Sequence, residues 1–203
     1  PRMKAVIAEV QGRAAVMQRD DIDTDAIFPG RFLRLVQRTG MGAHLFADWL
    51  AEGRPEVAFM AEPSPPGVLV ALQNFGCGSS REHAVWALSD YGVKAVVALS
   101  FGDIFRNNCV KNGVVAATVT PADHARLLQV LAQAGDAPLH LGIVDRSLRL
   151  PDGSVIAITL ADGHAEQLLS AEDEVDRTLR HDAALRAYEQ RVQQNQPWLA
   201  SMD

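Results

Sequence analysis

The sequence is poor in cysteine, in aromatic residues and in long apolar runs, and each shortage excludes a class of protein. Cys77 and Cys109 are its only cysteines, and no CxxC pair occurs. Neither a disulfide framework nor a structural zinc site is therefore predicted, and two thiols are too few to hold an iron–sulfur cluster. No apolar run approaches the roughly 20 residues of a transmembrane helix. We expect no metal bound by this chain and no membrane as a partner.

Basic residues are also in short supply. Acidic residues outnumber them by 25 to 19, which gives a formal charge of −6. Non-specific binding to nucleic acid needs a basic face, so nucleic acid is not an expected partner, although a local basic pocket for a small anion stays compatible with this balance. Residues 1–4 lack the apolar stretch of a secretory signal, so we expect a cytoplasmic protein.

The remaining composition is that of a globular protein. Hydrophobic residues make up 48% and charged residues 22% of the 203 positions, which are ordinary proportions for a folded domain. This length fits one domain. We expect a single domain over residues 1–203, whose part from about residue 165 onward is a helical C-terminal extension.

The middle of the chain has the clearest pattern. Residues 68–72 and 93–99 are short apolar runs typical of buried strands. Residues 79–91 between them carry the apolar stripe of a helix, and Gly92 is placed to end it. The order predicts a βαβ unit, in which two parallel strands are joined by a right-handed crossover. The fold class is therefore α/β.

Weaker patterns flank this unit, and they predict one element each. They are two short strands around Gly12 within residues 5–17, a weak helical pattern over 32–50 that is interrupted at residues 40–42, a polar loop over 102–113, a strand over 114–119, a helix over 122–134, a strand over 139–144 and a hairpin over 147–160.

The loop after the first buried strand is the best candidate for a site. Two glycines let the backbone turn sharply, and Ser79, Ser80 and Arg81 follow at the expected start of the helix. Backbone N–H groups and the positive end of the helix dipole favour an anion there. Ser79 to Glu82 also fits a capping box. One serine would cap the helix while the other faces a ligand, and the sequence leaves their order open.

Two further clusters have both a functional and an ordinary interpretation. The carboxylates of Asp21, Asp23 and Asp25 repel one another unless a bound cation or hydrogen-bond donors compensate their charge. The ordinary interpretation of this cluster is a solvated loop. They do not fit a calcium-binding EF-hand loop, since no Gly stands at its sixth position. Arg38, followed by Thr39, closes a run of three arginines that either grip carboxylates in bidentate geometry or form a solvated helix face.

Three segments resemble one known family, in the right order along the chain. They read DTDAIFP at residues 23–29, NFGCGSSREHA at residues 74–84 and SFGDIFRNNC at residues 100–109. Residues 38–46, RTGMGAHLF, resemble the bacterial form of the same family. Together the segments are similar to the small subunits of 3-isopropylmalate dehydratase, which correspond to the swivel domain of the aconitase superfamily.

The resemblance implies a fold, a reaction and a partner. The fold is a swivelling β/β/α domain that closes over a large subunit, which holds a [4Fe-4S] cluster, in a heterodimer or heterotetramer. The reaction isomerises 2-isopropylmalate and 3-isopropylmalate by dehydration and rehydration, as a step of leucine biosynthesis. This chain would bind no cofactor itself and would be an inactive hydro-lyase subunit without its partner.

The resemblance also implies roles for individual residues. Ser79 corresponds to the base that takes the proton, Arg81 to the arginine that binds substrate and favours the serine alkoxide, and Ser80 to a residue that hydrogen-bonds substrate. Asp25 corresponds to a catalytic aspartate of the active site. Proton removal beside a carboxylate builds negative charge, which N–H groups and a guanidinium stabilise, so the residue types suit these roles.

The identity of the substrate's side chain stays open. Arg38 and Thr39 fall in a segment that, by resemblance, discriminates between substrates. The chain departs from the family's usual pattern at residues 114–116 and 169–179. The alternatives are a related hydro-lyase acting on another 2-substituted malate, of citramalate, citraconate or homoaconitate type, and a non-catalytic anion-binding paralogue. A nucleotide-binding loop is disfavoured because no Lys follows the glycines.

Overall fold

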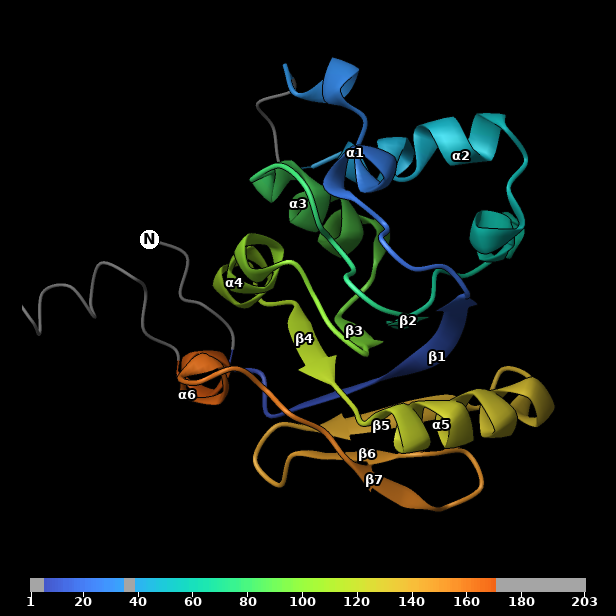
Figure 1. The fold of residues 1–203 in the computed structure, drawn as a ribbon, viewed down its shortest axis with the longest axis vertical. Helices are drawn as coiled ribbons and strands as arrows, with labels where there is room; N and C mark the ends of the chain where they lie inside the picture. Colours follow the sequence, from blue (N-terminus) through green and yellow to red (C-terminus); the bar gives the residue numbers. More distant parts are fainter. Residues whose placement is uncertain (1–5, 35–38, 171–203) are drawn as a thin grey trace, which may run out of the picture. The chain divides into compact units, whose positions relative to one another are not determined.

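The computed structural model describes residues 6–34 and 39–170 (Figure 1). Val6–Leu169 form one compact unit, and Ser170 is grouped with the chain ends in a second. Within residues 6–34 and 39–170, no helix is long and apolar enough to cross a membrane. The expected C-terminal extension begins with a short helix, His164–Leu169, and its residues 171–203 lie outside the described part.

The described elements alternate between strands and helices along most of the chain. The strands are β1 (Glu9–Met17), β2 (Val68–Ala71), β3 (Ala95–Ala98), β4 (Val115–Thr118), β5 (Pro138–Gly142), β6 (Ser147–Arg149) and β7 (Val155–Ala157). The α-helices are α1 (Thr24–Ile27), α2 (Ala47–Ala51), α3 (Glu82–Tyr91), α4 (Asp103–Lys111), α5 (Pro121–Ala134) and α6 (His164–Leu169). Short 3₁₀ helices are η1 (Gly30–Phe32), η2 (Met41–His44) and η3 (Pro55–Ala61).

All seven strands belong to one mixed sheet in the order β4-β3-β2-β1-β5-β6-β7. The pairs from β1 to β4 are parallel, and the pairs from β1 through β5 and β6 to β7 are antiparallel. The predicted βαβ unit is confirmed, because β2 and β3 are parallel neighbours joined by α3. The predicted hairpin is confirmed as well, as β6 and β7.

The parallel strands have two buried faces. In β3, Ala95 and Val97 belong to one hydrophobic core while Val96 belongs to the other. The first core also holds Leu127 of α5, so we name it the α5 core. The second holds Leu88 of α3, so we name it the α3 core. Burial on both faces explains why these strands read as continuous apolar runs rather than as an alternating pattern.

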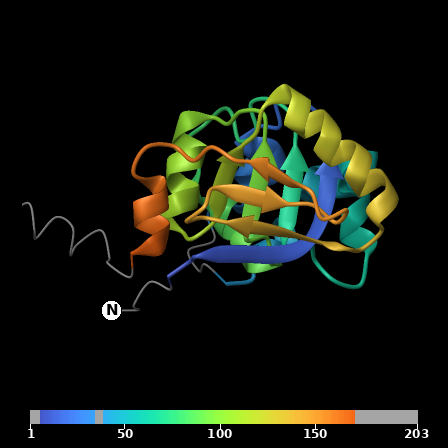
Figure 2. The same cartoon turned by 90° about the horizontal axis from the view of Figure 1, so that it is seen from below.

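The two ends of the sheet meet at Thr118 and Thr159. The N–H of Thr118 donates to the carbonyl of Thr159 at 2.9 Å, and the N–H of Thr159 donates back to Thr118 at 2.8 Å. This isolated bridge joins β4 to the segment after β7, so the curled sheet encloses the α5 core (Figure 2). Closing a sheet satisfies backbone groups that would otherwise stand at a free edge.

The first strand crosses between the two halves of the sheet without interruption. The prediction of two strands around Gly12 is wrong, because β1 is one strand whose first part pairs with β5 and whose second part pairs with β2. Gly12 is required by a close approach rather than by a turn. A Cβ on Gly12 would lie 2.6 Å from the Cα of Gly67, which is closer than any side chain tolerates.

Helices α3 and α4 lie side by side over the parallel strands (Figure 1). The polar loop predicted for residues 102–113 is wrong, since α4 occupies most of this segment. Its buried residues Phe105 and Cys109 belong to the α3 core, and its buried Val110 belongs to the α5 core. Asn and Arg residues between them lower the mean hydropathy and hide the helical pattern in the sequence.

The weak, interrupted helical pattern predicted for residues 32–50 is confirmed only in part. The described residues form the short helices η1, η2 and α2 in and beside this segment. Gly40 with φ 84° and Phe46 with φ 50° have left-handed backbones before η2 and α2, respectively. A continuous right-handed helix is therefore impossible across these positions.

Candidate active site

Two segments that are far apart in the sequence lie side by side. They are the acidic turn, which carries Asp21, Asp23 and Asp25, and the glycine loop, residues 73–78. The N–H of Asp21 donates to the carbonyl of Gln73 at 3.0 Å, and that of Gly76 donates to Ile22 at 2.7 Å. The N–H of Thr24 donates to Cys77 at 2.9 Å. Backbone hydrogen bonds in both directions thus join residues 21–24 to residues 73–77 and fix Asp25 close to the start of α3.

Each carboxylate of the acidic turn has a hydrogen-bond donor. The Asn74 amide donates to Asp21 at 2.7 Å, and the N–H of Ala26 donates to Asp23 at 2.7 Å, which caps α1. Asp25 accepts from Arg81. Donors therefore offset the repulsion between these acids, and within the described residues no group of three or more potential ligands is placed to hold a metal ion.

Helix α3 begins later than the sequence indicates. Its first residue is Glu82, its N-cap is Arg81, and no side chain caps it. The capping-box interpretation is wrong for both serines. Gly78 with φ 90° and Arg81 with φ −119° keep the chain out of helical conformation up to this point. In the described part of the chain the exposed Ser79 hydroxyl has no hydrogen-bond partner, so capping does not occupy it.

Arg81 and Asp25 form an ion pair beside this hydroxyl-bearing segment. The Arg81 side chain is only 16% exposed and the Asp25 side chain 58% exposed, so the carboxylate faces solvent and the guanidinium lies beneath it. Gly30 borders the pair, since a Cβ there would lie 3.5 Å from Asp25 Oδ1 and 3.7 Å from Arg81 Nη1. Asp25 supplies the negative charge that offsets a cation at a helix N-terminus.

Of the remaining two predicted site residues, only Thr39 belongs to the described part of the chain. Arg38 lies outside the described residues. Thr39 is exposed, and it precedes η2, whose Gly42 N–H donates to Asp90 near the last turn of α3 at 2.8 Å. Among the described residues no hydrogen bond joins Thr39 to Ser79, Arg81 or Asp25.

An aromatic stack ties the segment before residue 35 to the first turn of α3. Phe28 stacks on His83 with ring centroids 6.0 Å apart, and Phe32 lies 5.9 Å from Phe28. Phe32 in turn stacks on His44 at 4.1 Å. The residues on both sides of the undescribed residues 35–38 are therefore anchored close to the helix start.

Sequence reasoning missed two residues that hold the site. Thr24 is buried, and its hydroxyl donates to the carbonyl of Ser79 at 3.0 Å. Asn112, after α4, donates to Glu82 at 2.8 Å. Thr24 stands between two candidate aspartates, and that position was the only signal available. Asn112 stands directly before Gly113 and is 30 residues away from Glu82 in the sequence, so no local pattern links the two side chains.

The cysteines of this chain do not fit an iron–sulfur cluster. Burial raises the pKa of the Cys109 thiol strongly, and burial followed by the charges of Asp23 and Asp21 raises the pKa of the Cys77 thiol. Both shifts favour the neutral thiol, whereas a metal ligand must be a thiolate. Two protonated thiols lack both the number and the charge state that cluster ligation requires.

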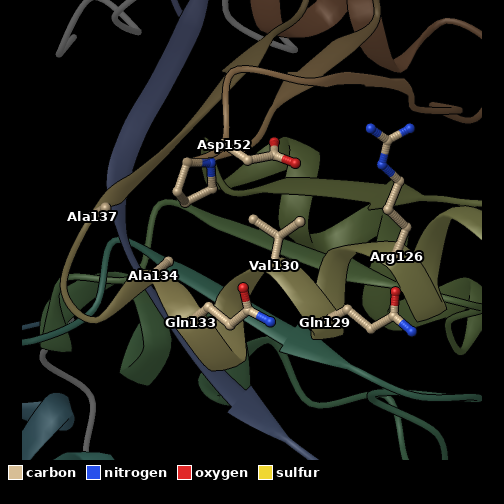
Figure 3. Close-up of a pocket in the computed structure, with 8 residues that line it drawn as sticks. Arg126, Gln129, Val130, Gln133, Ala134, Ala137 and Asp152 are labelled. Atoms are coloured by element: carbon tan, nitrogen blue, oxygen red, sulfur yellow. The ribbon is translucent and has the colours of Figure 1, made fainter.

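One cavity of the described residues lies elsewhere, between α5 and the β6–β7 turn (Figure 3). It has a volume of about 520 Å³, and its lining includes Arg126 and Val130 of α5 and Asp152 of the β6–β7 turn. None of the predicted site residues lines it. The candidate site is instead at the start of α3, where Ser79 and Ser80 are exposed.

The fold and the site together define a class of protein. The model of the aconitase C-terminal domain matches residues 4–122, which include the acidic turn, the glycine loop and α3. A second model, that of the C-terminal domain of the 3-isopropylmalate dehydratase small subunit, matches residues 177–201. The chain thus combines an aconitase-type domain with a C-terminal segment found in one branch of that class.

Individual relatives identify the branch. The 3-isopropylmalate dehydratase small subunit of Anaeromyxobacter dehalogenans is 43% identical over 189 residues, which are 90% of this chain and 96% of that protein. The one from Methylobacterium radiotolerans is 38% identical over 190 residues, 91% of this chain and 95% of that protein. The crystal structure of 3-isopropylmalate dehydratase from Methanocaldococcus jannaschii superposes with a TM-score of 0.64 at 28% identity, over 89% of this chain and 99% of that one. The chain belongs to the family of 3-isopropylmalate dehydratase small subunits.

Proposed function

We propose that this chain is the small subunit of a 3-isopropylmalate dehydratase, a hydro-lyase that interconverts 2-isopropylmalate and 3-isopropylmalate. The observation that carries the proposal is the exposed Ser79 hydroxyl, which no capping bond occupies, next to the Arg81–Asp25 ion pair. Family membership supports the reaction class. The start of α3 and Arg81 suit a dicarboxylate substrate, because N–H groups and a guanidinium both bind carboxylates.

Ser79 is the proposed base. In the dehydration, a proton leaves the carbon next to one carboxylate, a hydroxyl leaves the neighbouring carbon, and an alkene and water are formed. Readdition of water with the opposite regiochemistry gives the isomer. A serine hydroxyl is a weak base, so its alkoxide needs stabilisation by nearby positive charge. Arg81 supplies that charge, Asp25 holds the guanidinium, and Ser80 donates a hydrogen bond to substrate.

The departing hydroxyl needs a Lewis acid, which the thiols of this chain do not suit. We place it in the partner, a large subunit with a [4Fe-4S] cluster, so that this chain alone is inactive. Arg38 and Thr39 are proposed to contact the substrate's side chain from the segment that follows η1. The single domain over residues 1–203, with its helical extension from about residue 165, is proposed to dock with the large subunit in a heterodimer or a heterotetramer.

The test is reconstitution. The full chain is co-expressed with the large subunit of its own organism, and alkene formation from 2-isopropylmalate is measured for the complex and for each subunit alone. We expect turnover only in the complex, with the 2-substituted malate citramalate turned over more slowly. Turnover by the isolated chain contradicts the assignment of the Lewis acid to the partner. A complex that prefers another 2-substituted malate, or forms without activity, contradicts the proposed substrate or the catalytic role.

A further inference from the structure

The Ser79–Arg81 segment is held at both ends by side chains from other parts of the fold. At its first end, the Thr24 hydroxyl donates to the Ser79 carbonyl at 3.0 Å. Thr24 is only 1% exposed and its own N–H donates to Cys77 at 2.9 Å. The Thr24 side chain is thus held in place by the residues packed around it. If its hydroxyl lost the Ser79 carbonyl as acceptor, the buried hydroxyl would remain desolvated without a hydrogen bond, which costs free energy.

At the other end, Asn112 fixes Glu82, the first residue of α3. The Asn112 amide donates to Glu82 Oε1 at 2.8 Å and to the Asn108 carbonyl at 2.9 Å. Its Oδ1 accepts from Trp86 Nε1 at 3.0 Å. These contacts orient the amide unambiguously, because the acceptor side faces an indole N–H and the donor side faces a carboxylate and a carbonyl.

Only Ser80 and Arg81 lie between the two anchored residues, and neither is helical. Without a side-chain cap, α3 does not fix the conformation of the residues that precede it. Gly78, just before the segment, allows many backbone conformations. Among the described contacts, Thr24 and Asn112 hold the two ends of residues 79–82, while Asp25 holds the Arg81 side chain between them. The backbone from which the Ser79 hydroxyl projects is therefore held at Ser79 by Thr24 and at Glu82 by Asn112.

We propose that Thr24 and Asn112 are positioning residues that hold the two ends of residues 79–82 and so aim the Ser79 hydroxyl and the Arg81 guanidinium at substrate. The inference rests on the proposed function of Ser79. Neither residue touches the reacting atoms in this account. Their effect is on kcat, because a displacement of about 1 Å in a reacting group can lower the rate about a hundredfold.

Thr24 is tested by an isosteric pair of variants in the reconstituted enzyme. Thr24→Val removes the hydroxyl while it keeps the shape, and Thr24→Ser keeps the hydroxyl. We expect kcat to fall about ten- to a hundredfold in T24V with KM changed less than about threefold, and to remain within about threefold of wild type in T24S. Thr118→Val is the matched control, because it also removes a hydroxyl-to-carbonyl contact, and its kcat should be that of the wild type.

Asn112 is tested by exchanging donor and acceptor. Asn112→Asp places a carboxylate opposite Glu82 and should lower kcat about tenfold or more, as the helix start is pushed away. Adding Glu82→Gln restores a donor–acceptor pair in reverse orientation, and Asp at position 112 still accepts from Trp86. We expect the double variant to recover part of the lost kcat, because the donor to the Asn108 carbonyl is not restored. A merely destabilising Asn112→Asp would not be rescued in this way.

The carbonyl-carbon NMR shift of Ser79 in the full chain gives a readout that needs no partner. It should move in T24V and stay unchanged in T24S and T118V. An unchanged shift in T24V, or equal kcat in the wild-type and T24V complexes, overturns the inference and leaves the proposed function intact. Failure of the double variant to recover kcat overturns the part that concerns Asn112. An inactive wild-type complex overturns the proposed function and, with it, this inference.

Discussion

The side-chain amide of Asn74 donates a 2.7 Å hydrogen bond to Oδ1 of Asp21, and both residues have left-handed backbones, with φ 56° and 54°. Asn and Asp adopt this conformation at lower cost than other residues with a Cβ. Each of the two turns therefore has a left-handed residue at the point where the other comes closest, and the side chains of these two residues are hydrogen-bonded to each other. This pairing sets the register between the acidic turn and the glycine loop.

Replacement of Asn74 should reveal both contributions. Asn74→Ala loses the hydrogen bond and keeps a Cβ in the left-handed region, so the free energy of unfolding should fall by about 1–2 kcal/mol. Asn74→Gly loses the same bond but relieves the backbone strain, so it should fall by less. Urea unfolding measures both. If the glycine variant is the less stable of the two, strain at this position is not significant.

Ser79→Ala should abolish turnover in the reconstituted enzyme and leave assembly intact. General-base groups contribute about 10²- to 10⁴-fold to rates, and Ser79 makes no side-chain bond within the described residues that assembly or folding would miss. Turnover and co-elution with the large subunit are measured together. Ser89→Ala, an exposed serine on the same helix, is the control. Turnover like that of the wild type in S79A refutes Ser79 as the base.

Arg81→Lys should raise KM and lower kcat/KM about ten- to a hundredfold, because an ammonium cannot reproduce a bidentate guanidinium contact with a carboxylate. Arg126→Lys, in the remote cavity beside α5, is the matched control. Steady-state kinetics of the complex measures both variants. Unchanged constants in R81K would leave Arg81 with a structural role only, through its ion pair with Asp25.

Gly76 and Gly53 allow strain and steric overlap to be separated. Both have positive φ, 72° and 65°, but a Cβ on Gly76 would lie 2.1 Å from Cγ of Phe105, whereas a Cβ on Gly53 would have nothing within 4 Å. Gly53→Ala should cost about 1–2 kcal/mol for the backbone alone. Gly76→Ala should cost at least about 1–3 kcal/mol more, because Phe105 must move. Equal losses in urea unfolding would contradict the overlap.

His164 should make the domain less stable in mild acid. Burial, followed by the charge of Arg106, lowers the pKa of His164 below its ordinary value of 6.5. The unfolded chain then takes up the proton first as the pH falls through 6.5, so the free energy of unfolding decreases down to the folded-state pKa and is flat below it.

The comparison that isolates this effect is unfolding by urea at about pH 7.5 and about pH 5.5. His164→Gln retains an amide that can donate to Asn107, which lies 3.1 Å from His164 Nε2, and should reduce the pH dependence. The exposed His140→Gln is the control and should leave it unchanged. If the free energy of unfolding changes equally with pH in the wild type and in H164Q, protonation of His164 does not contribute to the pH dependence of stability.

The sequence predicted those elements whose signal is local. The βαβ unit followed from two apolar runs and the stripe between them, and the hairpin followed from its turn. Helix α4 was missed because its buried Phe105, Cys109 and Val110 stand among polar residues. The closure at Thr118 and Thr159 joins residues far apart in sequence, and no local pattern encodes such a contact.

The candidate site divides in the same way. Ser79, Ser80 and Arg81 were found because they follow the glycines directly, and Asp25 because a family motif contains it. The Arg81–Asp25 pair and the contacts of Thr24 and Asn112 depend on how distant loops meet, which only coordinates reveal. The capping box failed as a prediction because Glu82, its expected second member, is bound by Asn112 instead.

The parallel strands point successive side chains into two different cores, and this restricts which insertions and deletions the protein can tolerate. In β3, inserting or deleting one residue would send Val97 toward α3 and Val96 toward α5, and every later side chain of the strand would change interiors with them. Tolerated length variation must therefore fall in the loops, and the same loops carry the groups that meet substrate. New specificities can thus arise by loop exchange while both interiors keep their composition.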